Sequence, residues 1–201
     1  MTNAVDSRMG VIVLAGGRSR RMGGSDKAQL KLGSLRVIDY LCSQLPYGVP
    51  QVVVSPHSLG LIQVCECPPF GGPVAGIEAG FNYLQATAPR PLTAVLSVDA
   101  PDSPRLLRPL TDALDRAAQP ALVMPRSSDG FLQPLCSLWR SESLGQALHQ
   151  LADTRNRSAR ALISQAPSFA EIPADDATRD YDTPAEFAQF RPNQHLLSER
   201  R

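Results

Sequence analysis

The stretch VIVLAGGRSRRMGGSDK, residues 11–27, joins an apolar run to a basic loop that is rich in glycine. Residues 11–14 are apolar without alternation, which is typical of a strand buried on both faces of a sheet. The loop carries two glycine pairs and four cations, namely Gly16, Gly17, Gly23, Gly24, Arg18, Arg20, Arg21 and Lys27. Glycine lets backbone N–H groups approach a ligand, and the cations add charge-assisted hydrogen bonds. The stretch predicts a phosphate-binding loop, and a solvated basic loop is the alternative.

Outward from this stretch, apolar runs alternate with helical patterns along the 201 residues. This alternation predicts a single-domain, three-layer α/β/α fold with a mostly parallel twisted sheet, in which ligands bind beyond the carboxyl ends of the strands. We expect a flexible N-terminus over residues 1–8, the domain over 9–191 and a flexible C-terminal tail over 192–201. The expected strands are 11–14, 52–54, 93–98, 121–124 and 135–139, and the expected helices are 34–45, 74–84, 103–118, 143–151, 158–165 and 184–190.

The composition argues against several classes of partner. A formal net charge of +1 gives no electrostatic basis for binding nucleic acid or a membrane surface. No apolar segment approaches the ~18 residues that a membrane helix needs, and the first residues do not resemble a signal peptide. The four cysteines lack zinc-site spacing and are expected to be reduced thiols. We therefore expect a cytoplasmic protein.

Carboxylates stand where phosphate chemistry would need them. Asp99 ends an expected strand, so its side chain should emerge at the same sheet edge as the glycine-rich loop. Asp180 and Asp182 alternate, so they share one face of an extended segment. Carboxylates at this edge suit a Mg²⁺ ion between phosphate oxygens, as in nucleotidyl transfer. The alternative is that these aspartates cap helices, although Asp102 or Ser103 is the better cap near Asp99.

Three further segments are candidate substrate contacts. The segment GGP, residues 71–73, precedes an expected helix whose free N–H groups would suit a base, a ribose or a phosphate. The segment DGFLQPL, residues 129–135, is either a substrate loop or a hairpin turn. The segment TRNRSARAL, residues 154–162, either binds a second anionic substrate through its arginines or faces solvent.

Together these segments resemble the molybdenum cofactor guanylyltransferase (MobA) family, within the MobA-like nucleotidyltransferases. The family's opening pattern, LAGGxSxRMGxxDK, is matched in full by residues 14–27. Its GGPLAGI-like segment appears as residues 71–77, and its strand-ending aspartate as Asp99. Its QP[LT] segment appears as residues 133–135, and its late N-x-NTPE-like motif as residues 180–186. The resemblance covers about residues 9–191.

The resemblance implies a Rossmann-like nucleotidyltransferase fold and transfer of GMP from GTP to molybdopterin, with Mg²⁺ as cofactor and pyrophosphate released. It implies that Lys27, Arg21 and Asp99 are catalytic, that Asp99 and Asp182 hold the metal, and that Gln133 and Arg157 face the pterin. It also implies a nucleotide site formed by Leu14, Ala15, Gly16, Gly17, Arg18, Lys27, Gly72 and Asp99. The implied partners are GTP, molybdopterin and, transiently, other molybdenum cofactor biosynthesis proteins or apo-molybdoenzymes.

Departures from the family pattern leave alternatives open. Cys67 stands where the family often has aspartate, and residues 98–101 read VDAP rather than a Cys-Asp sequence. Asp180 and Asp182 replace asparagines, which is similar to related cytidylyltransferases, whereas Gly16 stands where those relatives usually carry alanine. The alternatives are a cytidylyltransferase, another small-molecule nucleotidyltransferase, or a catalytically weak accessory protein that binds a nucleotide.

Overall fold

The computed structural model describes residues 7–17, 26–32, 34–116, 119–174, 176–181, 186–187 and 190. Three residues of the expected site, Arg18, Arg21 and Asp182, lie outside these ranges. So do most of the expected helix over 184–190 and nearly all of the expected terminal segments. No helix within the described part of the chain combines the length and the apolar character that crossing a bilayer requires.

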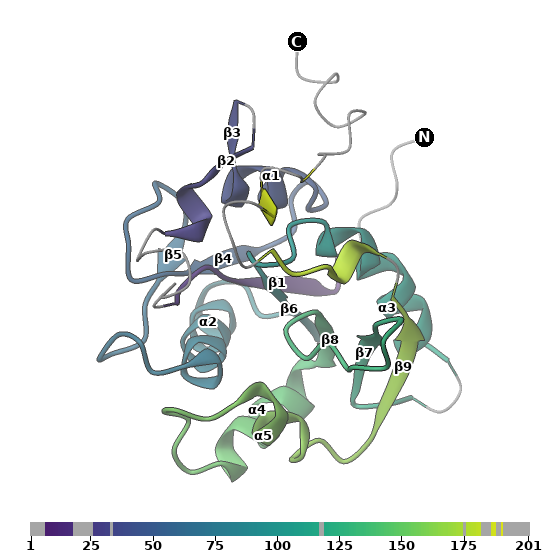
Figure 1. Cartoon of the computed structure of the whole chain (residues 1–201). Coiled ribbons are helices and arrows are strands. Elements are labelled where there is room, and N and C mark those ends of the chain that lie inside the picture. Colours follow the sequence, from purple (N-terminus) through teal and green to yellow (C-terminus); the bar gives the residue numbers. More distant parts are fainter. Residues whose placement is uncertain are drawn as a thin grey trace.

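A seven-stranded sheet forms the middle layer, with the order β5-β4-β1-β6-β8-β7-β9 (Figure 1). All neighbouring strands run parallel, except that β8 is antiparallel to both β6 and β7. The strands are β1 (Met9–Leu14), β4 (Gln51–Val54), β5 (Gln63–Val64), β6 (Leu92–Ser97), β7 (Leu122–Arg126), β8 (Ser137–Arg140) and β9 (Phe169–Pro173). The mostly parallel sheet expected from the sequence is thereby confirmed.

Helices cover both faces of the sheet (Figure 1). On one face lie α1 (Val37–Ser43) and α3 (Leu107–Leu114), and on the other α2 (Pro73–Thr87), α4 (Ser141–Gln150) and α5 (Ala159–Ile163). Val11 and Val13 belong to the first core, whereas Ile12 and Leu14 belong to the second. Successive strand residues point to opposite faces, so both faces of β1 are apolar. This explains the unbroken apolar run and confirms the three-layer α/β/α fold.

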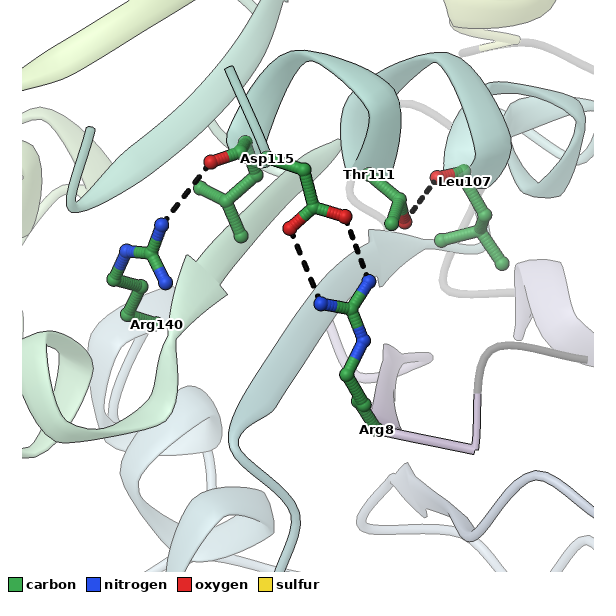
Figure 2. Close-up of polar contacts among 6 residues, drawn as sticks. Arg8, Leu107, Thr111, Asp115 and Arg140 are labelled. Atoms are coloured by element: carbon green, nitrogen blue, oxygen red, sulfur yellow. Dashed lines mark hydrogen bonds and ion pairs between the residues drawn. The ribbon is translucent and has the colours of Figure 1, made fainter. Parts of the chain in front are cut away.

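Arg8 fixes α3 to the edge of the sheet at which β1 and β6 begin (Figure 2). Its guanidinium donates to both carboxylate oxygens of Asp115, at 3.2 and 2.7 Å. Arg140, at the end of β8, donates to the Leu114 carbonyl at 3.1 Å. The exposed ion pair between Arg8 and Asp115 adds only about 0–1 kcal/mol to stability, so its main effect is to position α3. The site lies at the opposite end of the strands, where the carboxyl ends of β1 and β6 are found.

Several observed elements differ from those expected. The expected helix over 34–45 begins instead as strand β3 (Leu35–Arg36), which forms a small separate sheet with β2 (Lys31–Leu32), and turns helical only at Val37. The expected helix over 103–118 divides into the 3-10 helix η3 (Ser103–Leu106) and α3. Strands β5 and β9 were not expected, because both are short strands at the two edges of the sheet and neither contains an apolar run. Within β9, Ile172 is the one buried residue.

Candidate active site

The carboxyl ends of β1 and β6 meet at one point of the sheet edge. The Ala15 N–H donates to the Val54 carbonyl at 2.9 Å, and the Val98 N–H donates to the Leu14 carbonyl at 3.0 Å. These bonds extend the parallel ladder just past the strands and fix the backbone on either side of the glycine loop. Asp99 follows directly, so the loop and this carboxylate share one edge, as the sequence predicted.

Lys27 contacts Asp99 across this edge. The Lys27 Nζ lies 3.0 Å from the Asp99 Oδ1, and the Lys27 side chain is 12% exposed whereas that of Asp99 is 37% exposed. Lys27 begins the 3-10 helix η2 (Lys27–Gln29), in which Asp26 accepts the Ala28 N–H at 3.0 Å and Ala28 is fully buried. The cap and the buried methyl hold the lysine in place, and the aspartate remains open to a ligand.

Three adjoining cavities surround this pair. A small one of about 120 Å³ is lined by Leu14, Ala15, Gly16, Gly17, Lys27 and Asp99, among others. A second, of about 370 Å³, lies between the ends of β1 and β4 and the start of α2, and we name it the nucleoside cavity. A third, of about 590 Å³, lies between Asp99, the start of α2 and the segments 133–136 and 156–160, and we name it the acceptor cavity. Asp99 lines all three, so they meet at this carboxylate, while Lys27 lines the small cavity.

Close packing of α2 brings its first turn into the nucleoside cavity. A Cβ added at Gly80 would lie 2.7 Å from the Ile12 Cγ2, so only glycine allows the helix to approach β1 this closely. Gly72, at the N-cap of α2, has a φ of +89° and lines both large cavities. A glycine is favoured at such a φ. The first turn of α2 therefore borders the site, and the binding of a ligand by its N–H groups stays a prediction.

Every expected site residue within the described ranges lines at least one of the cavities. Gly16, Gly17 and Gly72 line the nucleoside cavity, and Gln133 and Arg157 line the acceptor cavity. The segment 129–135 connects β7 to the antiparallel β8 and also reaches the acceptor cavity, so it is a hairpin connection, and its role as a substrate loop stays a prediction. The geometry agrees with the expected grouping, and the individual roles stay predictions.

Asp180 is a second carboxylate in the acceptor cavity, close to Asp99. The Tyr181 N–H donates to the Asp99 carbonyl at 2.9 Å, which holds this late segment against the site. Burial, and secondarily the negative charge of Asp180, raises the pKa of the neighbouring Cys136 thiol to about 12. Mg²⁺ is typically bound by one or two carboxylates plus phosphate oxygens, so Asp99 and Asp180 fit that ion. The described residues contain no group of three or more His, Cys, Asp or Glu that would form a complete protein cage.

The capping roles expected for Asp102 and Ser103 are wrong. Asp102 occupies the N-cap position of η3 without a side-chain capping bond, and its Oδ1 accepts from the Tyr40 hydroxyl at 2.7 Å instead. The buried Ser103 Oγ has no hydrogen-bond partner among the described residues. Tyr40 belongs to α1, so Asp102 connects this helix to the segment that follows β6.

Sequence reasoning did not find several residues of the site. Glu66 lines the nucleoside cavity, and its Oε1 accepts the Gly71 N–H at 3.0 Å. Asn156 and Thr178 line the acceptor cavity. Asn156 lies within the segment 154–162, in which only the arginines were expected to bind a substrate. The contacts that place Glu66 and Asn156 join loops from distant parts of the chain.

Comparison with known proteins places this geometry in a family. The family described as the MobA-like NTP transferase domain matches residues 11–169. A molybdenum cofactor guanylyltransferase of Mesorhizobium japonicum is 36% identical over 164 residues, which cover 77% of this chain and 77% of that protein. One of Ectopseudomonas mendocina is 33% identical over 175 residues, which cover 83% of each.

Solved structures agree on the fold. Molybdopterin-guanine dinucleotide biosynthesis protein A from Archaeoglobus fulgidus superposes with a TM-score of 0.66 at 16% identity, over 90% of this chain and 96% of that one. The 2-C-methyl-D-erythritol 4-phosphate cytidylyltransferase from Thermus thermophilus gives 0.60 at 17% identity, over 90% and 95%. The nucleotidyltransferase fold expected from the resemblance is thus confirmed.

Proposed function

The chain belongs to the MobA-like NTP transferase family, and from this premise we propose that it transfers GMP from GTP to molybdopterin and releases pyrophosphate. The observation that carries the proposal is the position of Asp99, which lines both large cavities and pairs with Lys27 at 3.0 Å. One cavity receives the guanosine and the other receives the pterin. The relatives named molybdenum cofactor guanylyltransferase support this choice of substrates.

The transfer occurs where the cavities meet. A terminal phosphate oxygen of molybdopterin attacks the α-phosphorus of GTP, a new P–O bond forms, and the bond to the bridging oxygen of the β-phosphate breaks. Lys27 donates to the α-phosphate oxygens and offsets the charge that develops there. Backbone N–H groups at Gly16 and Gly17 bind the phosphates, while Gln133 and Arg157 orient the pterin. Outside the described residues, Arg18 and Arg21 are proposed to add phosphate contacts.

Asp99 is the proposed ligand of a Mg²⁺ ion, together with Asp180 or Asp182. When bound there, the ion neutralises charge between the phosphate oxygens of the nucleotide. Asp99 is partly exposed at the cavity, and within the described ranges Lys27 pairs with its Oδ1, so its second oxygen can face a ligand. An Asp99→Asn substitution keeps the shape and removes the charge. We expect this variant to bind GTP with an affinity that no longer depends on Mg²⁺.

A cytidylyltransferase on the same fold is the second candidate, favoured by Asp180 in the acceptor cavity. Nucleotide binding raises the melting temperature of the native state by mass action, so the two candidates are separable. We would measure melting with GTP, CTP, ATP and UTP, each with and without Mg²⁺. A GTP-selective shift that requires Mg²⁺ supports the proposal, and a CTP-selective shift replaces it by the second candidate. The absence of any shift favours a degenerate relative that no longer binds nucleotides, or ordered binding in which the pterin must come first.

The proposal includes a cellular setting. Cys42, Cys65, Cys67 and Cys136 are free thiols, which agrees with a reducing compartment, and we propose the cytoplasm. Transient contacts with other molybdenum cofactor biosynthesis proteins or with apo-molybdoenzymes would pass the product on. Crosslinking in cell extract, followed by mass spectrometry, tests for such contacts.

A further inference from the structure

Two loops from distant parts of the chain line the two large cavities, with Gly72 of the first loop lining both, and they bond directly to each other. The nucleoside loop, residues 66–72, contributes Glu66 and Phe70 to the nucleoside cavity. The acceptor loop, residues 153–158, contributes Asn156, Arg157 and Ser158 to the acceptor cavity. The Asn156 N–H donates to the Gly71 carbonyl at 2.6 Å, and the Arg155 Nη1 donates to the Pro68 carbonyl at 2.5 Å.

The contact between these loops is closely packed. A Cβ added at Gly71 would lie 2.8 Å from the Arg155 Nη1 and 2.9 Å from the Ala75 Cβ, so the guanidinium occupies the space that a side chain would need. Phe70, Gly72 and Asn156 all have positive φ, at 63°, 89° and 55°. Such backbone conformations in non-glycine residues persist only where the surroundings hold them. The two loops therefore hold each other in unusual conformations.

Few other side-chain bonds hold the acceptor loop. Thr154 donates to the Glu78 carboxylate of α2 at 2.6 Å, which fixes one end. Asp153 accepts the Arg155 N–H at 2.9 Å through its side chain and the Arg157 Nε at 3.3 Å through its carbonyl, and both bonds lie within the loop. Ser158 accepts the Ala161 N–H of α5, which fixes the other end. Between Thr154 and Ser158, the bonds that connect the described loop to the rest of the fold are those to the nucleoside loop.

We infer that Arg155 and Asn156 couple the two cavities, so that a nucleotide which orders the nucleoside loop also orders the acceptor loop. This inference rests on the proposed function for the occupants of the cavities. Arg155 is in neither cavity among the described lining residues, and it acts through the Pro68 carbonyl. It is therefore a positioning residue. Because coupling between two sites is reciprocal, an acceptor in its cavity also favours the nucleotide.

Hydrogen exchange of single amides tests the coupling. The Asn156 amide reports the contact between the loops, and the Gly71 amide, which donates to Glu66, reports the nucleoside loop. In the unmodified protein, we expect saturating GTP with Mg²⁺ to slow exchange at both amides by about fivefold or more. A factor of about five is the lower end of the range typical for coupling between two sites. In Arg155→Ala, we expect GTP to slow exchange at Gly71 but by less than about twofold at Asn156. Arg155→Lys keeps a donor and should restore part of the effect.

A second comparison needs no nucleotide. In the ligand-free protein, Arg155→Ala should accelerate exchange at Gly71, on the other loop, without lowering the melting temperature by more than a few degrees. Arg90→Ala is the matched control, because Arg90 also donates to a backbone carbonyl, that of Pro89, but lines neither cavity. Exchange at Gly71 that is the same in both variants overturns the coupling, whatever GTP does. Failure of GTP to protect Gly71 in the unmodified protein instead counts against the proposed function.

Discussion

The Nζ atom of Lys27 lies 3.0 Å from the Oδ1 atom of Asp99, the carboxylate that lines all three cavities of the site. The lysine comes from the end of the basic loop and the aspartate from the end of β6. The fold thus brings one positive and one negative group to the same position, between the proposed sites of donor and acceptor. A transfer between phosphates needs both charges. The positive lysine stabilises the phosphate oxygens, and the negative aspartate binds a cation.

Removal of the Lys27 charge should slow the transfer far more than it destabilises the fold. We expect Lys27→Ala to lower kcat by about 100- to 1000-fold, which is the usual effect of deleting one group that stabilises developing charge. Pyrophosphate release with GTP and molybdopterin measures it. Lys31→Ala is the matched control, since Lys31 is an exposed lysine in nearby β2 that lines none of the three cavities. Equal activity of the two variants would refute the role of Lys27.

Gly16 and Gly17 should respond differently to one added methyl group. A Cβ at Gly16 would lie 3.1 Å from the Pro56 Cδ, a ring atom with little freedom, whereas a Cβ at Gly17 meets no described atom within 4 Å. We expect Gly16→Ala to cost about 1 kcal/mol of unfolding free energy and to weaken GTP binding, and Gly17→Ala to change stability by less than about 0.5 kcal/mol. Urea denaturation and calorimetric titration measure the two effects. Identical stability of the variants would contradict the packing around Pro56.

Two helix glycines give a second matched pair. A Cβ at Gly80 would lie 2.7 Å from Ile12 and 3.1 Å from Val54, while one at Gly145 in α4 would meet only the Phe81 ring at 3.4 Å. We expect Gly80→Ala to lower the unfolding free energy by about 1–3 kcal/mol through overpacking. Gly145→Ala should raise it by about 0.5–1 kcal/mol, because alanine is the better helix residue. A stabilising Gly80→Ala, measured by urea denaturation, would show that α2 does not pack against β1 as described.

Burial should divide the thiols by reactivity. Cys65 and Cys67 are exposed, whereas burial raises the pKa of Cys42 to about 11 and that of Cys136 to about 12. The thiolate is the reactive form, so the partly buried Cys42 and the buried Cys136 should stay inert at pH 8. We expect N-ethylmaleimide to modify Cys65 and Cys67 in the native protein and Cys136 only after unfolding, as read by peptide mass spectrometry. Rapid native labelling of Cys136 would mean that the acceptor cavity opens more widely than the structure shows.

The sequence predicts the centre of the fold well, for a physical reason. Residues 11–14 are buried on both faces, so the pattern is a continuous apolar run, and the strand's place in a parallel sheet then predicts which edge binds ligands. Asp99 could be placed beside the glycine loop by this rule alone. The rule needs only the order of strands and helices, and it does not need side-chain contacts.

The periphery could not be predicted in the same way. Strand β9 pairs with β7 at the sheet edge, but most of its side chains are exposed, so no run or alternation marks it. Leu35 and Arg36 fit a helical pattern, yet they pair with β2. The bond between Asn156 and Gly71 joins loops that are distant in the chain, and neither sequence carries a signal for the other. Such contacts depend on how the layers pack.

Transfer of label from GTP tests the central claim most directly. The protein would be incubated with molybdopterin, Mg²⁺ and GTP that carries ³²P at either the α- or the γ-phosphate, with Lys27→Ala in parallel. The account predicts that α-label moves to the pterin product and that γ-label leaves in pyrophosphate. Both label transfers should be much slower with Lys27→Ala than with the unmodified protein. Label that moves from CTP and not from GTP, or γ-label that appears on the pterin, would contradict it.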